Sequence, residues 1–381
     1  MLNSLHIKNF RALEDFKVSK LGRINLIVGK NNSGKSSILE ALRIYIGGAS
    51  RGLLAELAAM HDEPSEQIEE GNAADDLYPF TNFFTGRQFP QHGDGILIGD
   101  IDNPSSSLTI DFGQEVTEEK ILATGEIRKT RTIRRLLKEG EELPDSPATI
   151  LPVLVVTHGG REIETIHLHS FILNRFLVNK SPVACAFVPT SFASMDDLAK
   201  LWDKIGLTQD KQIVHQAMQM IAPEFQELMF INSNAKTVVG SSGNQRTAIV
   251  KLANNEGPIP LKSMGDGMSR ILQLSLNMFA AKGGFLLIDE FENGLHYSVQ
   301  EQVWEMMFAM AEKLDMQVFA TTHSRDCVQS FAKVARQRQE DDGILLRVGR
   351  SIRTSDYGKI TSTAFNGQQL FDMTQADMEV R

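Results

Sequence analysis

The sequence predicts an α/β fold in which a mixed sheet carries a phosphate-binding loop. Residues 24–46 read as an apolar strand, a glycine-rich loop and a helix with apolar residues at helical spacing. The apolar run 285–288 ends in two acids, and helices alternate with strands from there to residue 348. Four shorter strand-like pieces between 95 and 169 predict an antiparallel sheet. Residues 194–228 are expected to be mainly helical.

Composition indicates a folded protein rather than a membrane or disulfide-rich one. The chain has 381 residues, 42% of them hydrophobic, which suits one large or two medium domains. No basic segment followed by an apolar one opens the chain, and no apolar run approaches the ~20 residues needed to span a bilayer. The two cysteines, Cys185 and Cys327, lie far apart and predict neither a disulfide framework nor a zinc site. We therefore expect a cytoplasmic protein with no membrane partner.

The glycine-rich loop is a complete G-x-x-x-x-G-K-S motif, residues 29–36. Its glycines let backbone N–H groups turn onto phosphate oxygens, Lys35 reaches the β- and γ-phosphates, and the Ser36 hydroxyl faces Mg²⁺. The helix that follows adds the positive end of its dipole. We expect the nucleotide to contact Gly29, Asn31, Asn32, Ser33, Gly34, Lys35, Ser36 and Ser37.

A second motif, FLLIDE at 285–290, places two acids at the end of a buried strand. In α/β sheets ligands bind at the carboxyl ends of the strands. Asp289 is the expected metal ligand there, and Glu290 is expected to polarise the attacking water. The alternative is a solvated acidic turn, since many strands end in acids.

A third motif, SMGDG at 263–267, opens a helix. Ser263 and Gly265 could offer a hydroxyl and backbone N–H groups to an anion. The alternative is a plain loop in which Asp266 caps the helix.

A fourth motif, FATTHS at 319–324, places His323 just beyond a buried strand. A histidine in this position can contact a γ-phosphate and sense its loss. The alternative is a buried structural histidine.

The order of these motifs carries a family resemblance. Lys35, Ser263, the acid pair and His323 follow one another, with 227 positions between Lys35 and Ser263. The stretches LHIKNFRAL and INLIVGKNNSGKSSILEAL resemble the amino-terminal signature of the SMC/RecF/OLD group of ABC-type ATPases. The stretches SMGDGMSRIL, FLLIDEFENGLHYSVQEQVW and QVFATTHS resemble stand-alone AAA-type ATPases related to the OLD nucleases. The resemblance covers about residues 1–46 and 258–330.

The resemblance implies an ABC-type ATPase head with a helical insertion. It divides the chain into an N-terminal ATPase lobe at 1–190, a helical insertion at 191–250, a C-terminal ATPase lobe at 251–350 and a tail at 351–381. It implies ATP and Mg²⁺, hydrolysis of ATP, and a homodimer or higher homo-oligomer formed through an ATP sandwich.

The resemblance also assigns residues. It implies catalytic roles for Glu290 and His323, and it brings Arg11 to the phosphates, although Arg11 could equally be a surface charge. The chain departs from the group at Met264, which replaces a glycine, and at Phe291, which replaces a proline. ABC-type ATPases carry a glutamine in a segment called the Q-loop. No residue of this chain stands out for that place, and Gln88 is only a guess.

For function, the sequence favours a nucleotide-driven switch that controls a separate effector. OLD-like relatives carry a nuclease in the same chain, but the 33 residues after Val348 leave no room for a TOPRIM domain, and no HNH-like set is present. A separately encoded TOPRIM or HNH nuclease is therefore the expected partner, in anti-phage defence or DNA maintenance. The alternative is a RecF-like DNA-binding repair ATPase.

DNA remains a possible partner because of one basic run. Six of the eleven residues at 128–138 are basic in a chain of net charge −9, so this run could follow a phosphate backbone. It could equally be a solvated face or pair with the acidic segment at 61–76. Absent heptads exclude long coiled-coil arms, and the long spacing between motifs argues against a transporter subunit.

Overall fold

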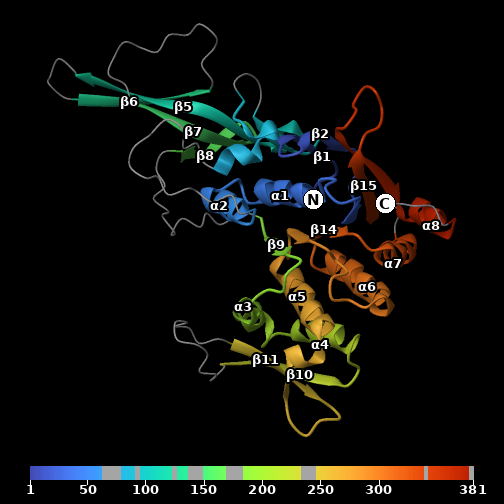
Figure 1. Cartoon of the computed structure of the whole chain (residues 1–381). Coiled ribbons are helices and arrows are strands. Elements are labelled where there is room, and N and C mark those ends of the chain that lie inside the picture. The colour runs from blue at the N-terminus through green and yellow to red at the C-terminus, as the bar shows by residue number, and fades with distance from the viewer. Residues whose placement is uncertain are drawn as a thin grey trace.

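The structure is a computed structural model in which three parts, each built on a sheet, are arranged one beside the next (Figure 1). It describes residues 1–61, 79–90, 95–121, 127–135, 149–168, 183–232, 246–338 and 342–376. A six-stranded mixed sheet lies in the middle, an antiparallel sheet lies on one side, and a small helix-and-sheet unit lies on the other. The predicted α/β class is confirmed.

The central sheet has the strand order β16-β15-β3-β14-β13-β9. Its strands are β3 (Ile24–Val28), β9 (Cys185–Val188), β13 (Phe285–Ile288), β14 (Gln317–Thr322), β15 (Gly343–Arg350) and β16 (Ile360–Asn366). All neighbours pair in parallel except β15 and β16, which are antiparallel. The carboxyl ends of β3, β13 and β14 therefore meet at one edge, which brings the predicted motifs together.

Strand β3 shows why its sequence is almost continuously apolar. Ile24, Leu26 and Val28 lie in the hydrophobic core on one face of the sheet, and Ile27 lies in the core on the other. The one polar residue, Asn25, is buried and makes hydrogen bonds to Gly22 and to the Val318 carbonyl. A strand covered on both faces cannot alternate apolar with polar residues.

Helices cover both faces of the sheet. They are α1 (Lys35–Ile46), α2 (Arg51–Ala59), α5 (Asp266–Ala280), α6 (Tyr297–Lys313), α7 (Arg325–Arg336) and α8 (Gly367–Gln375). α1 belongs to the core shared with the antiparallel sheet, whereas α5, α6 and α7 belong to the opposite core. In that second core Trp304 is fully buried, and its ring stacks on Phe291 with the centroids 3.7 Å apart.

The antiparallel sheet confirms the short strands predicted between 95 and 169. Its strands are β1 (Leu5–Phe10), β2 (Leu13–Val18), β4 (Ile96–Gly99), β5 (Leu108–Ile121), β6 (Ile127–Arg135), β7 (Thr149–His158) and β8 (Arg161–His167). The order is β2-β1-β4-β5-β7-β8, with β6 paired to the far half of β5. The β5–β6 hairpin extends away from the body of the molecule (Figure 1).

The predicted insertion contains helices and, in addition, a sheet. Its elements are α3 (Met195–Ile205), α4 (Lys211–Gln219), β10 (Phe225–Asn232) and the start of β11 (Arg246–Leu252). The sheet continues beyond residue 250 with the rest of β11 and with β12 (Ile259–Pro260). The prediction of helix as far as residue 228 was wrong, because β10 begins at Phe225. Phe225, Leu228 and Phe230 point into the core while the strand pairs with β11, and this pairing outweighs local helix propensity.

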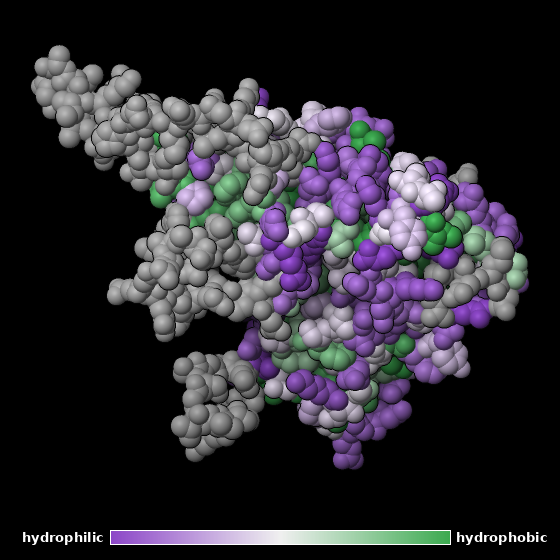
Figure 2. Space-filling model, turned by 45° about the horizontal axis from the view of Figure 1, so that its top comes forward, coloured by the Kyte–Doolittle hydropathy of each residue, from purple (hydrophilic) through white to green (hydrophobic). Residues whose placement is uncertain are grey.

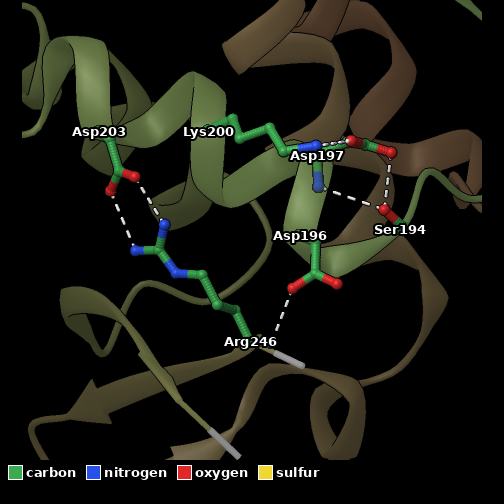
Figure 3. A network of polar contacts seen from close by, with 6 residues as sticks. All are labelled: Ser194, Asp196, Asp197, Lys200, Asp203 and Arg246. Atoms are coloured by element: carbon green, nitrogen blue, oxygen red, sulfur yellow. Dashed lines mark hydrogen bonds and ion pairs between the residues drawn. The ribbon is translucent and has the colours of Figure 1, made fainter. Parts of the chain in front are cut away.

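A polar network ties α3 to the start of β11 (Figure 3). Ser194 caps α3 by accepting the Asp197 N–H, and Asp196 accepts the Arg246 N–H at 2.7 Å. The Arg246 guanidinium donates to both oxygens of Asp203, at 2.6 and 3.0 Å. Bidentate pairs of this kind fix the relative orientation of the two groups as well as stabilising the contact, so the start of β11 is held in place on α3.

Residues expected to form a tail are built into the central sheet. β16 pairs with β15 along its whole length, and α8 follows with a capping box at Asn366 and Gln369. β16 also lies beside β2, with the Ser362 hydroxyl donating to the Lys17 carbonyl at 2.7 Å. The division of the chain into lobes otherwise stays a prediction.

The described surface is largely polar. Figure 2 shows hydrophilic residues over most of the described part of one face, with smaller hydrophobic groups between them. Among the described residues, no helix has the length and apolar character needed to cross a membrane.

Candidate functional site

The glycine-rich loop joins β3 to α1 with a backbone that requires its glycines. A side chain at position 29 would lie 2.2 Å from the Val348 carbonyl oxygen, so only glycine fits. Gly34 has φ +94° and directly precedes α1, in the left-handed region that favours glycine. The first N–H groups of α1 therefore point out of the loop, where an anion binds.

Lys35 lies folded over this loop. Its side chain is buried, and Nζ donates to the Gly29 carbonyl at 2.8 Å and to the Lys30 carbonyl at 2.9 Å. Burial lowers the pKa of Lys35, while the carboxylates of Asp289, Glu290 and Glu292 act in the opposite direction. The lysine and the three acids thus belong to one electrostatic site.

Asp289 emerges from β13 between two threonines. Its Oδ1 accepts from the Thr321 hydroxyl at 2.7 Å, and its Oδ2 accepts from the Thr190 hydroxyl at 3.0 Å. Thr321 lies near the carboxyl end of β14 and Thr190 just after β9, and these two strands flank β13 in the sheet. The carboxylate is fixed in direction, and each oxygen keeps a lone pair for a cation or a water.

Glu290 has an unusual backbone, with φ +46°. A left-handed non-glycine residue costs about 1–3 kcal/mol. Its N–H donates to the Thr321 hydroxyl at 2.9 Å, and its carbonyl accepts from Arg270 at 2.8 Å. These two hydrogen bonds stabilise the left-handed backbone of Glu290, which would otherwise relax to a more favourable conformation.

Glu292 connects the acid turn, residues 289–292, with the predicted switch histidine. Its Oε1 accepts the His323 backbone N–H at 2.9 Å. Its Oε2 is buried and has no hydrogen-bond partner among the described residues. His323 itself is half-buried at the end of β14, one strand away from Asp289.

The signature segment, residues 263–267, lies at the start of α5. Ser263 and Gly265 are exposed, and Gly265 has φ +90° with open space where a side chain would stand. Within the described residues, no hydrogen bond joins either of them to the loop 29–37 of the same chain. Behind the segment, a side chain at Gly267 would lie 3.1 Å from the Gly294 carbonyl oxygen, so the segment packs closely against the loop that follows the acid turn.

Arg11 is neither a free surface charge nor an obvious phosphate ligand in this state. Its Nε lies 2.7 Å from Glu40 Oε2, its side chain is 12% exposed, and its guanidinium lies over the Phe83 ring. Glu40 is on α1, so the pair joins the turn after β1 to the helix of the phosphate loop. A role for Arg11 at the phosphates stays a prediction.

Four residues of the site were not predicted from the sequence. They are Glu292 of the acid turn itself, and Thr190, Arg270 and Thr321, which bond to that turn. Gln88, the guess for a Q-loop residue, is exposed at the end of η2 (Thr85–Arg87). The residue just after β9 that bonds the Asp289 side chain is instead Thr190. The run of four apolar or small residues before Pro189, Cys185–Val188, was the sequence feature from which β9 could have been predicted.

The geometry suits a magnesium-bound nucleoside triphosphate. Ser33 Oγ is buried without a hydrogen-bond partner among the described residues, and the Lys35 ammonium is satisfied only by loop carbonyls. Both groups are available to phosphate oxygens. Ser36, exposed on the first turn of α1, and Asp289 supply the oxygen ligands that Mg²⁺ prefers, and the ion would neutralise phosphate charge there.

Comparison with known proteins agrees with this geometry. A family model described as "AAA domain, putative AbiEii toxin, Type IV TA system" matches residues 24–326. An ATP/GTP phosphatase of Helicobacter pylori is 24% identical over 358 residues, which cover 89% of each chain. The OLD nuclease of Thermus scotoductus is also 24% identical, over 85% of this chain and 59% of its own length.

Two further likenesses are narrower or more distant. The Rad50 ATPase of Archaeoglobus fulgidus is 50% identical over 48 residues, 13% of this chain and 5% of that one. The SMC head bound to the C-terminal winged-helix domain of ScpA aligns over 96% of this chain and 97% of its own, with a TM-score of 0.47 and 13% identity. Because the family match covers about four fifths of its length, this chain belongs to the AAA-domain family and is an ATPase.

Proposed function

We propose that this ATPase is a dimerisation switch, in which two chains close on ATP and the closed form controls a separate effector. The observation that carries the proposal is the signature segment. Ser263 and Gly265 stand exposed just before a helix, and among the described residues no hydrogen bond links them to the phosphate loop of their own chain. A helix start can bind an anion through its free N–H groups, and this exposed start could receive the nucleotide held by a second chain.

Each residue of the site has a distinct task in this proposal. Lys35 leaves the Gly29 and Lys30 carbonyls and donates to phosphate oxygens, while Ser36 and Asp289 hold Mg²⁺. Glu290 accepts a proton from the attacking water, and His323 contacts the γ-phosphate. Hydrolysis removes the group that holds the two chains together, and the dimer opens.

The dimer is tested with a variant that traps ATP. Glu290→Gln keeps the size of the side chain but removes the base, which typically lowers turnover by roughly 10²–10⁴-fold. We expect this variant to be a monomer with ADP and a dimer with ATP in light scattering. Adding Ser263→Arg should abolish the dimer, whereas Ser105→Arg, at an exposed serine between β4 and β5, should leave it intact. A Glu290→Gln protein that stays monomeric in saturating ATP contradicts the proposal.

The effector is proposed to be a nuclease encoded separately, of the TOPRIM or HNH type, acting in anti-phage defence or DNA maintenance. Support comes from the OLD nuclease relative, in which the matched region is 59% of a longer chain that is named as a nuclease. We expect a nuclease produced from the neighbouring gene to co-purify with this ATPase and its toxicity to depend on Lys35 and Glu290.

The insertion offers a surface for such an effector. Met229 and Ile231 lie on the outward face of β10, 57% and 41% exposed, and Leu207 is fully exposed in the loop after α3. Met229→Glu with Ile231→Glu should release the effector without changing basal ATP hydrolysis. Ile352→Glu, at an equally apolar exposed site on the β15–β16 loop, is the matched control. Full effector binding by the double variant contradicts this assignment of the surface.

A second candidate function, RecF-like DNA binding, is favoured by the projecting hairpin. The basic run lies on β6, an outer strand of the sheet, in which Lys129 stands opposite Glu119 and Arg131 opposite Thr117 of β5. Residues 62–76, suggested as an acidic partner for this run, and 136–138 lie outside the described residues. Reversing Arg131, Arg134 and Arg135 to Glu should remove any DNA binding whose affinity falls steeply with salt. Salt-independent binding, or binding unchanged by the triple variant, contradicts it.

A further inference from the structure

Arg270 is the most deeply buried charged residue of the described chain. It lies on α5, one turn beyond the signature segment, and its side chain is completely buried. Nη1 donates to the Pro189 carbonyl at 2.7 Å. Nη2 donates to the carbonyls of Asp289 at 2.9 Å and Glu290 at 2.8 Å. All three acceptors are main-chain carbonyls, so this buried guanidinium holds the backbone in place rather than pairing with a carboxylate.

With these bonds, every N–H and C=O group of the two peptide units that flank the Glu290 Cα has a hydrogen-bond partner. The Asp289 and Glu290 carbonyls accept from Arg270, the Glu290 N–H donates to the Thr321 hydroxyl, and the Phe291 N–H donates to the Thr321 carbonyl. The left-handed φ of Glu290 is thereby set from both sides. Hydrogen bonds from a charged donor are stronger than those between neutral groups, so the two bonds from Arg270 stabilise the strained conformation of Glu290.

The guanidinium stays charged in its buried position. Burial lowers the pKa of Arg270 to about 10, and the carboxylates of Asp289, Glu292 and Glu290 oppose that shift. Arginine side chains stay protonated in proteins, so these bonds persist in the working enzyme.

We propose that Arg270 is a positioning residue that aims the Glu290 carboxylate and joins the acid turn to the signature helix. The first part needs only the ATPase; the second rests on the proposed dimer. Ser263 and Gly265 directly precede α5, and Arg270 lies on the first turns of this helix. If the nucleotide of a second chain displaces the signature, the movement therefore reaches the Glu290 backbone through the Arg270 side chain.

The test separates aiming from folding. Arg270→Lys keeps the charge but has no planar fork, and it cannot reach three carbonyls at once. We expect at least a tenfold lower kcat, with the Kd of a fluorescent ATP analogue changed less than twofold. In the Glu290→Gln background, adding Arg270→Lys should change the residual rate less than twofold, because no carboxylate remains to be aimed. Arg23→Lys is the matched control. Arg23 also donates to a main-chain carbonyl, that of Ala311, but it precedes β3 at the end of the sheet away from the phosphate loop.

The outcomes decide between the two roles. If Arg270 only supports the fold, then ATP binding and Tm fall together and the losses from Arg270→Lys and Glu290→Gln multiply. If the lysine variant does not fold, Arg270→Gln is measured in the same way, and a kcat equal to wild type in either variant overturns the proposal. The light-scattering test of the dimer does not involve Arg270, so a protein that stays monomeric but shows the selective loss of kcat keeps the aiming role and loses only the link to the signature.

Discussion

Thr321 donates its hydroxyl to Asp289 Oδ1 at 2.7 Å, and the same hydroxyl accepts the Glu290 N–H at 2.9 Å. One side chain of β14 therefore orients the expected metal ligand and the backbone of the expected base. Because β14 and β13 are parallel neighbours, their carboxyl ends bring these residues together although they are more than 30 positions apart.

Replacing Thr321 tests this relationship. Thr321→Val keeps the shape but removes both bonds and leaves the Glu290 N–H without its partner, at a cost of about 1–3 kcal/mol. We expect kcat to fall about tenfold or more, since about 1.4 kcal/mol corresponds to a factor of ten. Thr321→Ser keeps the hydroxyl and should retain most of the activity in a steady-state assay. Equal kcat for the valine and serine variants would show that the hydroxyl is not used.

Lys35 is predicted to be required for ATP binding. Lys35→Ala removes the buried ammonium that now bonds two loop carbonyls, and with it the charge available to phosphate. Titration with a fluorescent ATP analogue should show no saturable binding. Lys30→Ala, at the exposed neighbour on the same loop, should bind within a few-fold of wild type. Comparable affinities for the two variants would contradict the role of Lys35.

Phe291 is predicted to be a structural residue of the acid turn. Its ring is fully buried against Trp304, and its N–H donates to the Thr321 carbonyl at 2.9 Å. Proline, which related sequences are expected to carry here, would give up that bond. Phe291→Ala should lower the free energy of unfolding by about 3–5 kcal/mol in chemical denaturation. A loss no larger than that of Ile352→Ala, at an exposed site, would contradict this role.

The insertion is predicted to weaken in acid because of His215. Burial between Trp202 and Phe225 lowers the pKa of His215 below its ordinary value; Glu227 opposes this and Lys211 adds to it. The folded pKa is therefore below the unfolded one, so stability is present at neutral pH and is lost as pH falls through both values. Tm should decline between about pH 7 and 5. His215→Gln should flatten that decline, and an unchanged profile would exclude this histidine as the cause.

The sequence allowed prediction of the parts of the site that are local in the chain. The phosphate loop needs only nine consecutive residues between a strand and a helix, and FLLIDE and FATTHS are each a strand with its exit. Their meeting follows from the rule that parallel strands share a carboxyl edge. Helix α1, the central strands β3, β13, β14 and β15, and the antiparallel strands β4, β5, β7 and β8 were accordingly predicted. Strands β2, β6, β9 and β16 were not predicted.

The missed features all depend on distant contacts. Thr190 bonds Asp289 across 99 positions, and Arg270 bonds Pro189 across 81, distances over which no periodicity operates. β10 was taken for helix because its fit against β11 is tertiary. β16 was taken for tail because its partner strand, β15, decides whether ITSTAFN is extended.

The central claim, that each working site combines the phosphate loop of one chain with the signature of another, is tested most directly by mixing two inactive variants. Lys35→Ala chains lack a working loop, and Ser263→Arg chains lack a working signature. A mixed dimer contains one site built from two intact halves. With equal amounts and free exchange, half the dimers are mixed, so we predict ATP hydrolysis at about a quarter of the wild-type rate. A rate no higher than that of the two variants assayed separately would contradict the account.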